Sequence, residues 1–458
     1  MDTTTVLLLN QDCVAAHEGV EFRLNRAGKH PENPVMLPGQ PHQWDSLQVS
    51  WPATVLYDAS EGLFRCWYSG LDVVQTKNRF WRPGYAESRD GVHWEKPELG
   101  QVTFLDRPTN QIAVGWEHTV LSFVFANPDP AFPPSRRFGS YWTEVLPDGR
   151  LQKGLAWSPD AVTWTRAGTA YEPRERTGFQ DISQLVFEPE ARNAEDRVRG
   201  YGQILAERAW DGRLVRNIGL VQGAEPEHVD DAAQPVILRP EGPVDEELHF
   251  ASVLKAGGVY LMLFESDRFA ANPIHGDLRL AASPNGREFR RVHPQEALVG
   301  TGPKGSWEEN LLVTTTAAMQ EVGEEVHIYY IGCPNLYNSW PAAYAVSPER
   351  RGAMFAPSYL GLATLPRDRF AYAAGPGTIT TRTLALHEGR LWLNCEGHGL
   401  RVDALDAAGR GVALGHLEQQ QAGAVYRPVA WQAGHPTGEV QLRVTLPMDA
   451  KLYSLRAA

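Results

Sequence analysis

Acidic residues stand at or just before several apolar, strand-like stretches of this sequence. Asp181 lies in FQDISQLVF, Glu247 lies in DEELHFASV, and Glu309 lies in SWEENLLV. If the fold brings the starts of these stretches together, their carboxyls form a close cluster, and mutual repulsion raises the pKa of some of them. A carboxyl with a raised pKa can act as a general acid, whereas an ionised neighbour can act as a base or a nucleophile.

Histidine and tryptophan residues accompany these acids. His249 is two residues after Glu247, so both side chains can point to the same face of a strand, and Glu117 is followed directly by His118. A tryptophan precedes an acid in QWDS, GWEH and SWEE. This pattern predicts either a pocket with aromatic walls or a packing feature that recurs because the structure itself repeats. The residues in it are Trp44, Asp45, Trp116, Glu117, Trp307 and Glu308.

A turn motif recurs between the apolar stretches. YAESRDGVHWEKPELG runs from Tyr85 to Gly100, and weaker copies are LAWSPDAVTWTRAG and LAASPNGREFRRV. Ser and Asp side chains can bind backbone N–H groups two residues on, and Gly supplies the positive φ that a tight turn needs. The motif therefore predicts a hairpin whose following aromatic residue packs over the turn, and we interpret it as structural.

Five units of strand, polar turn and strand precede or include these hairpins, beginning near residues 45, 110, 180, 246 and 308. They recur every 62 to 70 residues without helices between them. Four-stranded antiparallel units in series are typical of a β-propeller, so residues 1–370 are predicted to form five blades. Residues 371–458 alternate strictly between apolar and polar residues, which predicts a separate β-sandwich. The expected fold class is all-β.

Composition excludes several classes of protein. The 14 Trp, 42 Gly and 33 Pro residues favour short strands and turns. The net charge of −12 and the lack of a basic stripe argue against nucleic acid. The four cysteines are far apart and suggest reduced core residues. Because no basic leader or long apolar run is present, we expect a cytoplasmic protein that binds no membrane.

Five blades followed by a β-sandwich resemble the five-bladed propeller glycosidases of glycoside hydrolase families 32, 43, 68 and 130. The most similar stretches are ATVLYDASEGLFRCWYSG and YAESRDGVHWEKPELG. The resemblance implies that carboxylates at the starts of the innermost strands converge on a central funnel. It places Asp181 at the third blade, as base or substrate-orienting group, and Glu247 at the fourth, as general acid. By simple alignment the acid position falls on His249.

One position departs from this resemblance. Families 32 and 43 carry an Asp before the proline of the first blade, whereas this chain has Trp51 before Pro52. Asp45, seven residues before Pro52, is the nearest alternative, and Glu309 is another candidate for the remaining catalytic carboxylate. Trp44, Trp51, Glu117, His118, His249 and Trp307 are the candidate substrate-binding residues, with indoles as stacking walls for a sugar.

The resulting hypothesis is a glycoside hydrolase, or a related transglycosidase or phosphorylase, acting on a small oligosaccharide or a fructan-like glycoside. The alternative is a carbohydrate-binding propeller without catalysis, because the first-blade Asp is replaced by Trp51. No Gly-rich phosphate loop, HExxH or GxSxG motif occurs. His118 and His249 leave room for a cation on the axis, but no ligand spacing requires one, so neither a metal nor a cofactor is expected.

Overall fold

The regular elements of this protein are almost all strands. The helices among the described residues are three short 3-10 turns, Gln11–Cys13, Pro134–Arg136 and Ala194–Asp196. The computed structural model describes residues 4–72, 82–113, 119–128, 132–145, 151–171, 179–207, 212–230, 235–242, 245–268, 275–334, 357–419, 423–432 and 434–458. The predicted all-β class is confirmed.

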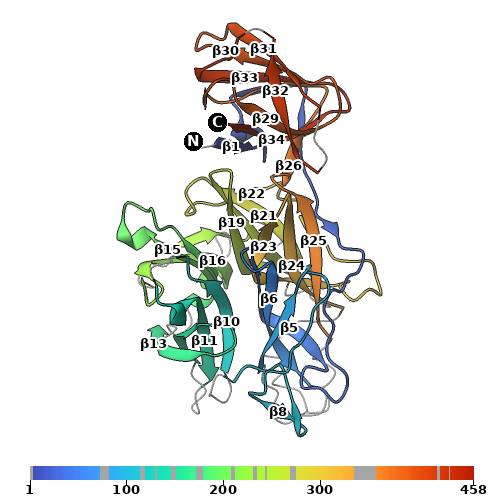
Figure 1. The fold of residues 1–458 in the computed structure, drawn as a ribbon. Helices are drawn as coiled ribbons and strands as arrows, with labels where there is room; N and C mark the ends of the chain where they lie inside the picture. Colours follow the sequence, from blue (N-terminus) through green and yellow to red (C-terminus); the bar gives the residue numbers. More distant parts are fainter. Residues whose placement is uncertain are drawn as a thin grey trace.

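Five groups of antiparallel strands follow one another along the described part of the chain (Figure 1). The first contains β5 (Gln48–Asp58), β6 (Leu63–Leu71) and β7 (Arg82–Ser88). The second contains β10 (Thr119–Ala126), β11 (Phe138–Val145), β12 (Leu151–Ser158) and β13 (Thr165–Tyr171). The third contains β14 (Phe179–Phe187), β15 (Val198–Glu207), β16 (Leu214–Glu225), β17 (His228–Asp230) and β18 (Val236–Leu238).

The fourth and fifth groups continue the same pattern. The fourth contains β19 (Glu246–Ala256), β20 (Val259–Arg268), β21 (His275–Ser283) and β22 (Arg290–Val292). The fifth contains β23 (Leu311–Val322), β24 (Glu325–Cys333), β25 (Tyr359–Pro366) and β4 (Gly28–Lys29). Because β4 comes from the N-terminal part of the chain, this last group joins the two ends of the ring. A short ribbon of β8 (Thr103–Phe104) and β9 (Arg107–Pro108) lies beside the first group.

The first strands of the five groups contact one another in cyclic order: β5 with β10, β10 with β14, β14 with β19, β19 with β23, and β23 with β5. Side-chain hydrogen bonds connect several of these neighbours. Gln184 of β14 bonds to Ser252 and Val253 of β19, and Ser252 accepts the N–H of Ala318 in β23. All five first strands also line one cavity of about 340 Å³ at their second halves. The arrangement is a propeller-like ring, and its division into five complete four-stranded blades stays a prediction.

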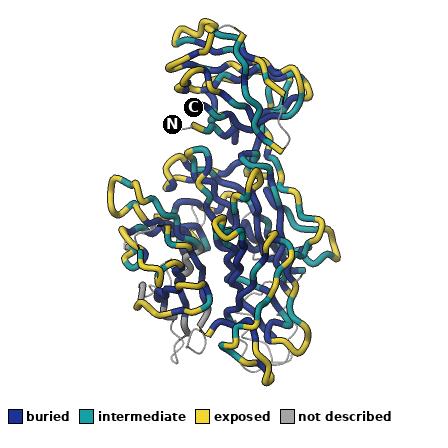
Figure 2. Tube along the Cα trace, in the orientation of Figure 1, coloured by how far each residue is buried: buried dark blue, intermediate teal, exposed yellow. Residues whose placement is uncertain are grey.

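Apolar clusters fill the spaces between neighbouring groups. β20 shows why, because its consecutive side chains point to opposite faces. Leu261 and Leu263 pack against the fifth group, whereas Met262 and Phe264 pack against the third. Three further clusters lie between the first and second, second and third, and first and fifth groups. Strands buried on both faces need nearly continuous apolar sequence, which these strands have. Figure 2 shows the buried strands and the exposed loops around them.

Each first strand carries a β-bulge or register irregularity, in the first half of β5, β10 and β19 and near the middle of β14 and β23. The register shifts lie between Ser50 and Thr54, Leu121 and Phe123, Ile182 and Gln184, Leu248 and Ala251, and Thr314 and Met319. A bulge places extra residues against one partner residue and redirects their side chains, and bulges are over-represented next to active sites. On β5 and β19 the bulges therefore lie near the strand starts, where they redirect the side chains that include Trp51 and His249.

The Ser-x-Asp-Gly hairpins are confirmed as structural. The Ser88 hydroxyl accepts the N–H of Gly91 at 2.9 Å, and Asp90 Oδ1 accepts the N–H groups of Val92 and His93, both at 2.8 Å. The copies that begin at Ser158 and Ser283 repeat these bonds. The fourth residue of the motif, Gly91, Ala161 or Gly286, has a φ of +70° to +77° in all three copies.

The remaining strands form a second, twelve-stranded sheet at the top of Figure 1. Its N-terminal members are β1 (Thr4–Leu7), β2 (Ala16–Glu18) and β3 (Glu21–Leu24). Its C-terminal members are β26 (Ala371–Ala374), β27 (Gly377–Thr380), β28 (Leu384–Leu386), β29 (Leu391–Glu396), β30 (Arg401–Leu405), β31 (Gly411–Leu417), β32 (Tyr426–Trp431), β33 (Gly438–Leu446) and β34 (Lys451–Ala457).

This sheet is continuous, because β32 pairs with both β31 and β29, and it encloses an apolar cluster of its own. β1 pairs with β34, β2 with β27 and β3 with β26, so N-terminal residues share the C-terminal sheet. The two-layer sandwich and the division between residues 370 and 371 stay predictions.

Two expectations from composition concern cysteines and membranes. The four cysteines are free, and Cys66, Cys333 and Cys395 are buried, as predicted for core thiols. Burial raises the pKa of the Cys333 thiol to about 12. Within the described ranges no helix has the length and apolar character that crossing a membrane requires. The cytoplasmic location stays a prediction.

Candidate functional site

The start of β19 presents a partly accessible carboxylate. Glu247 is the second residue of this strand and its side chain is 20% exposed. It accepts hydrogen bonds from the backbone N–H of Arg216, at 3.3 Å, and from Nη1 of the same residue, at 3.0 Å. Arg216 belongs to β16 of the third group, so this contact bridges two neighbouring groups. Both donors bind the same oxygen, Oε2, so they orient Glu247 and leave part of its carboxylate exposed to solvent.

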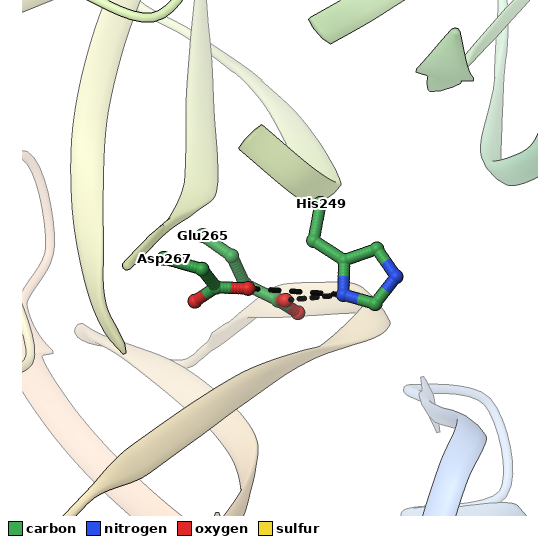
Figure 3. A group of neighbouring side chains, drawn as sticks. All are labelled: His249, Glu265 and Asp267. Atoms are coloured by element: carbon green, nitrogen blue, oxygen red, sulfur yellow. Dashed lines mark ion pairs between the residues drawn. The ribbon is translucent and has the colours of Figure 1, made fainter. Parts of the chain in front are cut away.

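A buried cluster of one histidine and two acids lies next to Glu247 (Figure 3). His249 lies in the bulge of β19, whereas Glu265 and Asp267 lie two residues apart on β20 and share a face of that strand. His249 Nδ1 is 3.4 Å from Glu265 Oε2 and 3.7 Å from Asp267 Oδ2. Both acids are at most 1% exposed. Glu265 Oε1 accepts the N–H of Thr314 of β23 at 2.7 Å, which fixes its carboxyl.

Burial dominates the ionisation of all three side chains. It raises the pKa of Glu265 well above its usual range, and the nearby charge of Asp267 raises it further. It also raises the pKa of Asp267 well above its usual range, with repulsion from Asp277 and Glu247 adding to the rise and Arg216 opposing it. Burial and the charge of Arg216 lower the pKa of His249 well below its usual range. In the absence of a cation, the cluster thus favours neutral groups.

Aromatic rings cover the side of this cluster that faces the first group. Phe250, also in the bulge of β19, stacks on Trp51 with ring centroids 3.9 Å apart. Its ring lies 3.8 Å from that of His249. Trp51 is in the bulge of β5, at the position where the resemblance called for an Asp. The structure therefore connects Trp51 to His249 through the ring of Phe250, while the role of Trp51 in substrate binding stays a prediction.

The recurring Trp–acid pairs form a packing unit. Trp44 is 2% exposed and stacks on Tyr68, whose hydroxyl donates to Asp45 Oδ2 at 2.7 Å. Lys96 Nζ lies 2.5 Å from the same Asp45 oxygen. Asp45 is itself 1% exposed, and its partners Tyr68 and Lys96 belong to the first group.

The fifth group repeats this unit with different residues. Trp307 stacks on Tyr330, whose hydroxyl donates to Glu308 Oε2 at 2.8 Å, and Lys29 Nζ lies 2.8 Å from Glu308 Oε1. Each tryptophan also fits where two glycines lack a Cβ: Gly70 and Gly84 in the first group, Gly332 and Gly361 in the fifth. Of the two interpretations of the Trp–acid pattern, the packing feature accounts for these contacts. A catalytic role for Asp45 and sugar stacking by Trp44 or Trp307 stay predictions.

The remaining sequence candidates are placed less fully. Glu309 lies in the loop before β23, where it accepts the N–H of Gly305 and an amide N–H of Asn310. Asp181 is the third residue of β14, and its side chain is outside the described part. Glu117 and His118, like Trp116, lie outside the described residues.

Sequence analysis did not single out Glu265 and Asp267. They end the run VYLMLFESD, in which two acids two residues apart follow a buried apolar strand. Such a spacing puts both carboxyls on one face. It was a usable signal, because acids on a fully buried strand need a partner or a function.

No protein-family model matches the chain, and no curated protein matches it. Solved structures do resemble it. A putative glycoside hydrolase from Parabacteroides distasonis is 13% identical, with 77% of this chain and 98% of that chain covered and a TM-score of 0.48. A glycosyl hydrolase from Bacteroides ovatus is 15% identical, with 77% and 95% covered and a TM-score of 0.48.

A third solved structure has a similar degree of likeness. A β-1,2-mannobiose phosphorylase from Listeria innocua, in complex with β-1,2-mannobiose, is 11% identical, with 75% of this chain and 97% of that chain covered and a TM-score of 0.49. Because all three TM-scores are below 0.5, these likenesses carry no argument about the activity of this chain.

Proposed function

We propose that this protein is a carbohydrate-active enzyme that cleaves glycosidic bonds at the starts of its first strands. The observation that carries the proposal is Glu247, a half-buried carboxylate held by Arg216 beside the His249, Glu265 and Asp267 cluster. The starts of the bulged first strands are also where the resemblance to propeller glycosidases places catalytic carboxylates.

Asp181 is the proposed partner of Glu247. Gln184, three residues after Asp181, hydrogen-bonds to Ser252 and Val253, which follow Glu247 on β19. The segments before these contacts therefore run toward the same end of the ring, and β14 contacts β19 directly. This backbone placement supports a site shared by the two acids.

The two carboxyls would divide the chemistry. Glu247 would protonate the leaving glycosidic oxygen, and Asp181 would activate water, act as nucleophile or orient the sugar. A carboxyl separation of about 5 Å would favour retention of anomeric configuration, and about 6.5–9.5 Å would favour inversion. Trp51 and Phe250 would supply the apolar wall of the sugar site. The substrate class proposed is a small oligosaccharide or a fructan-like glycoside.

The test is a panel of nitrophenyl glycosides and oligosaccharides assayed with the wild type, Glu247→Gln and Asp181→Asn. Each variant is expected to lose about 10²–10⁴-fold in kcat, as removal of a general acid or base does. Glu188→Gln is the matched control. Glu188 is 15% exposed and lies 2.6 Å from Lys255, so it resembles Glu247, but it follows the far end of β14. The activity of Glu188→Gln should equal that of the wild type.

Two results would overturn the proposal. Unchanged turnover in both variants would remove these residues from the reaction. Saccharide binding by the wild type, measured by calorimetry, without turnover of any substrate on the panel would favour the carbohydrate-binding alternative.

A further inference from the structure

Three potential ligand atoms converge in the buried cluster beside Glu247. His249 Nδ1, Glu265 Oε2 and Asp267 Oδ2 come from two paired strands, and Figure 3 shows the imidazole pointing its Nδ1 at both carboxyls. The ligand atoms of the three residues all lie within 4.8 Å of one another. The bulge at Leu248–Ala251 turns His249 toward β20, so the geometry is built into the backbone.

The separations suit a small cation. Zn²⁺ binds His nitrogen and carboxylate oxygen at about 2.0–2.2 Å in tetrahedral geometry, which places neighbouring ligand atoms about 3.3–3.6 Å apart. The distances of 3.4 Å and 3.7 Å from His249 Nδ1 to the two carboxyl oxygens are close to that range. A direct hydrogen bond at these lengths would be weak. A cation between the three atoms accounts better for the arrangement.

Two buried oxygens of the cluster, Glu265 Oε2 and Asp267 Oδ1, accept no hydrogen bond from an N–H or hydroxyl donor among the described residues, and the two carboxyls interact with each other. Leaving such atoms unsatisfied in the interior costs about 1–3 kcal/mol each, and more when they are charged. The Asp267 carboxyl occupies space that the absence of a side chain at Gly276 leaves open, because a Cβ at Gly276 would lie 2.0 Å from Asp267 Oδ1. A cation between the two carboxyls would satisfy these oxygens, as a shared proton does in the metal-free cluster.

The charged groups around the cluster also favour a bound cation. The charged groups around the cluster are the carboxyls of Glu247, Glu265, Asp267 and Asp277 and the guanidinium groups of Arg216 and Arg279. Once Glu265 and Asp267 release the protons that burial favours in the metal-free cluster, the four carboxyls and two guanidinium groups of these described residues carry a net charge of −2. One divalent cation would neutralise it.

We propose that His249, Glu265 and Asp267 bind one divalent transition-metal cation, of which Zn²⁺ and Mn²⁺ fit the mixed ligand set. Imidazole favours Zn²⁺ over Mg²⁺ and Ca²⁺, whereas carboxylates also suit Mn²⁺. Three protein ligands leave a coordination position for water or a substrate oxygen, as in catalytic metal sites. The proposal departs from the sequence-based expectation of no metal. Metal binding at this site does not require the proposed function to be correct. A role of the cation in turnover, by contrast, would rest on the proposed function.

Metal binding is tested directly, without substrate. The full-length protein is stripped with EDTA, dialysed and titrated calorimetrically with ZnCl2, MnCl2, CaCl2 or MgCl2. One equivalent of Zn²⁺ or Mn²⁺ should bind with a dissociation constant in the micromolar range or below, and Ca²⁺ and Mg²⁺ should bind more weakly. Titrations in buffers of different ionisation enthalpy should show proton release, because the ligands must be deprotonated. Absence of stoichiometric binding of both Zn²⁺ and Mn²⁺ would overturn the proposal.

Substitutions locate the site. His249→Asn and Asp267→Asn should each weaken binding by about 10–100-fold or more. His327→Asn is the matched control, since His327 is also a mostly buried histidine, 3.5 Å from the single carboxylate of Glu325, and it should bind the metal as the wild type does. Gly276→Ala supplies a variant that keeps all three ligands but displaces the Asp267 carboxyl, and it should also weaken binding. Wild-type affinity in either ligand variant, with folding verified by circular dichroism, would contradict the assignment.

Discussion

The side-chain hydroxyls of Thr54 and Thr316 hydrogen-bond to each other where the first strand of the first group meets the first strand of the fifth. The two residues are 262 positions apart in the sequence. Thr54 Oγ1 also accepts the N–H of Val124, and Thr316 Oγ1 donates to the carbonyl of Ala53. This small buried network therefore connects three of the five first strands.

Thr54→Val should lower the free energy of unfolding by about 2–4 kcal/mol. The substitution leaves the Val124 N–H and the Thr316 hydroxyl without one buried partner, at about 1–3 kcal/mol each. Chemical denaturation monitored by tryptophan fluorescence measures the loss. Thr54→Ser keeps the hydroxyl but loses the methyl group, and it should retain most of the stability, whereas a Thr54→Val variant as stable as the wild type would show that the hydroxyl network contributes nothing.

Lys96→Met should destabilise the protein by about 2–4 kcal/mol, because it leaves the buried Asp45 carboxylate with Tyr68 alone. This is below the cost for a fully buried pair, since Lys96 is 20% exposed. The double variant Asp45→Asn/Lys96→Met should recover part of the loss, because the amide oxygen still accepts from Tyr68. Additive losses in a double-mutant cycle would show that Asp45 and Lys96 are not coupled.

Gly91→Ala should destabilise the protein by about 2–4 kcal/mol. Gly91 has a φ of +77°, and a Cβ there would lie 2.3 Å from the Tyr329 hydroxyl, so backbone strain and a collision add. Gly62→Ala separates the two effects, because Gly62 has a φ of +58° and nothing within 4 Å of its Cβ position. That variant should cost about 1 kcal/mol in thermal melts. Equal costs at the two glycines would rule out the collision.

Local and repeated features of this fold were predictable from sequence. The hairpins at Ser88, Ser158 and Ser283 depend on side-chain bonds within five residues, so their motif identifies them. The apolar strand pairs likewise predicted the five strand groups. The pairing of β1 with β34 is different, because register between segments at opposite ends of a chain leaves no local pattern.

The site was predictable only in part, because sequence gives positions along strands but not the bulges that aim side chains. Alternation placed Glu247 and His249 on one face. The bulge that follows Leu248 instead buries His249 against Glu265 and Asp267 and leaves Glu247 partly exposed. Asp45 was a candidate because it is the acid nearest to Pro52, before which the resemblance expected an Asp, and only tertiary contacts showed that Tyr68 and Lys96 bind it.

Glu265→Gln should make the metal-free protein less sensitive to rising pH. Burial and Asp267 raise the pKa of Glu265 in the folded state, so between the ordinary carboxyl pKa of about 4 and the raised value the folded chain holds a proton that the unfolded chain has released. The stability contributed by this group is therefore greatest below about pH 4 and is lost as the pH rises, by up to about 1.4 kcal/mol per pH unit. His249, whose pKa is lowered by burial, contributes the opposite slope below about pH 6.5 in wild type and variant alike.

The stability of Glu265→Gln minus that of the wild type should therefore increase from about pH 5 to about pH 8 in EDTA, by at least about 1.4 kcal/mol. The substitution preserves the bond from the Thr314 N–H, because the oxygen of the introduced amide also accepts. Denaturation curves at several pH values measure the difference. Thr54→Val changes no titratable group, so its cost should stay constant over the same range and serves as the control. A pH-independent difference for Glu265→Gln would show that Glu265 is already ionised in the folded protein near pH 5.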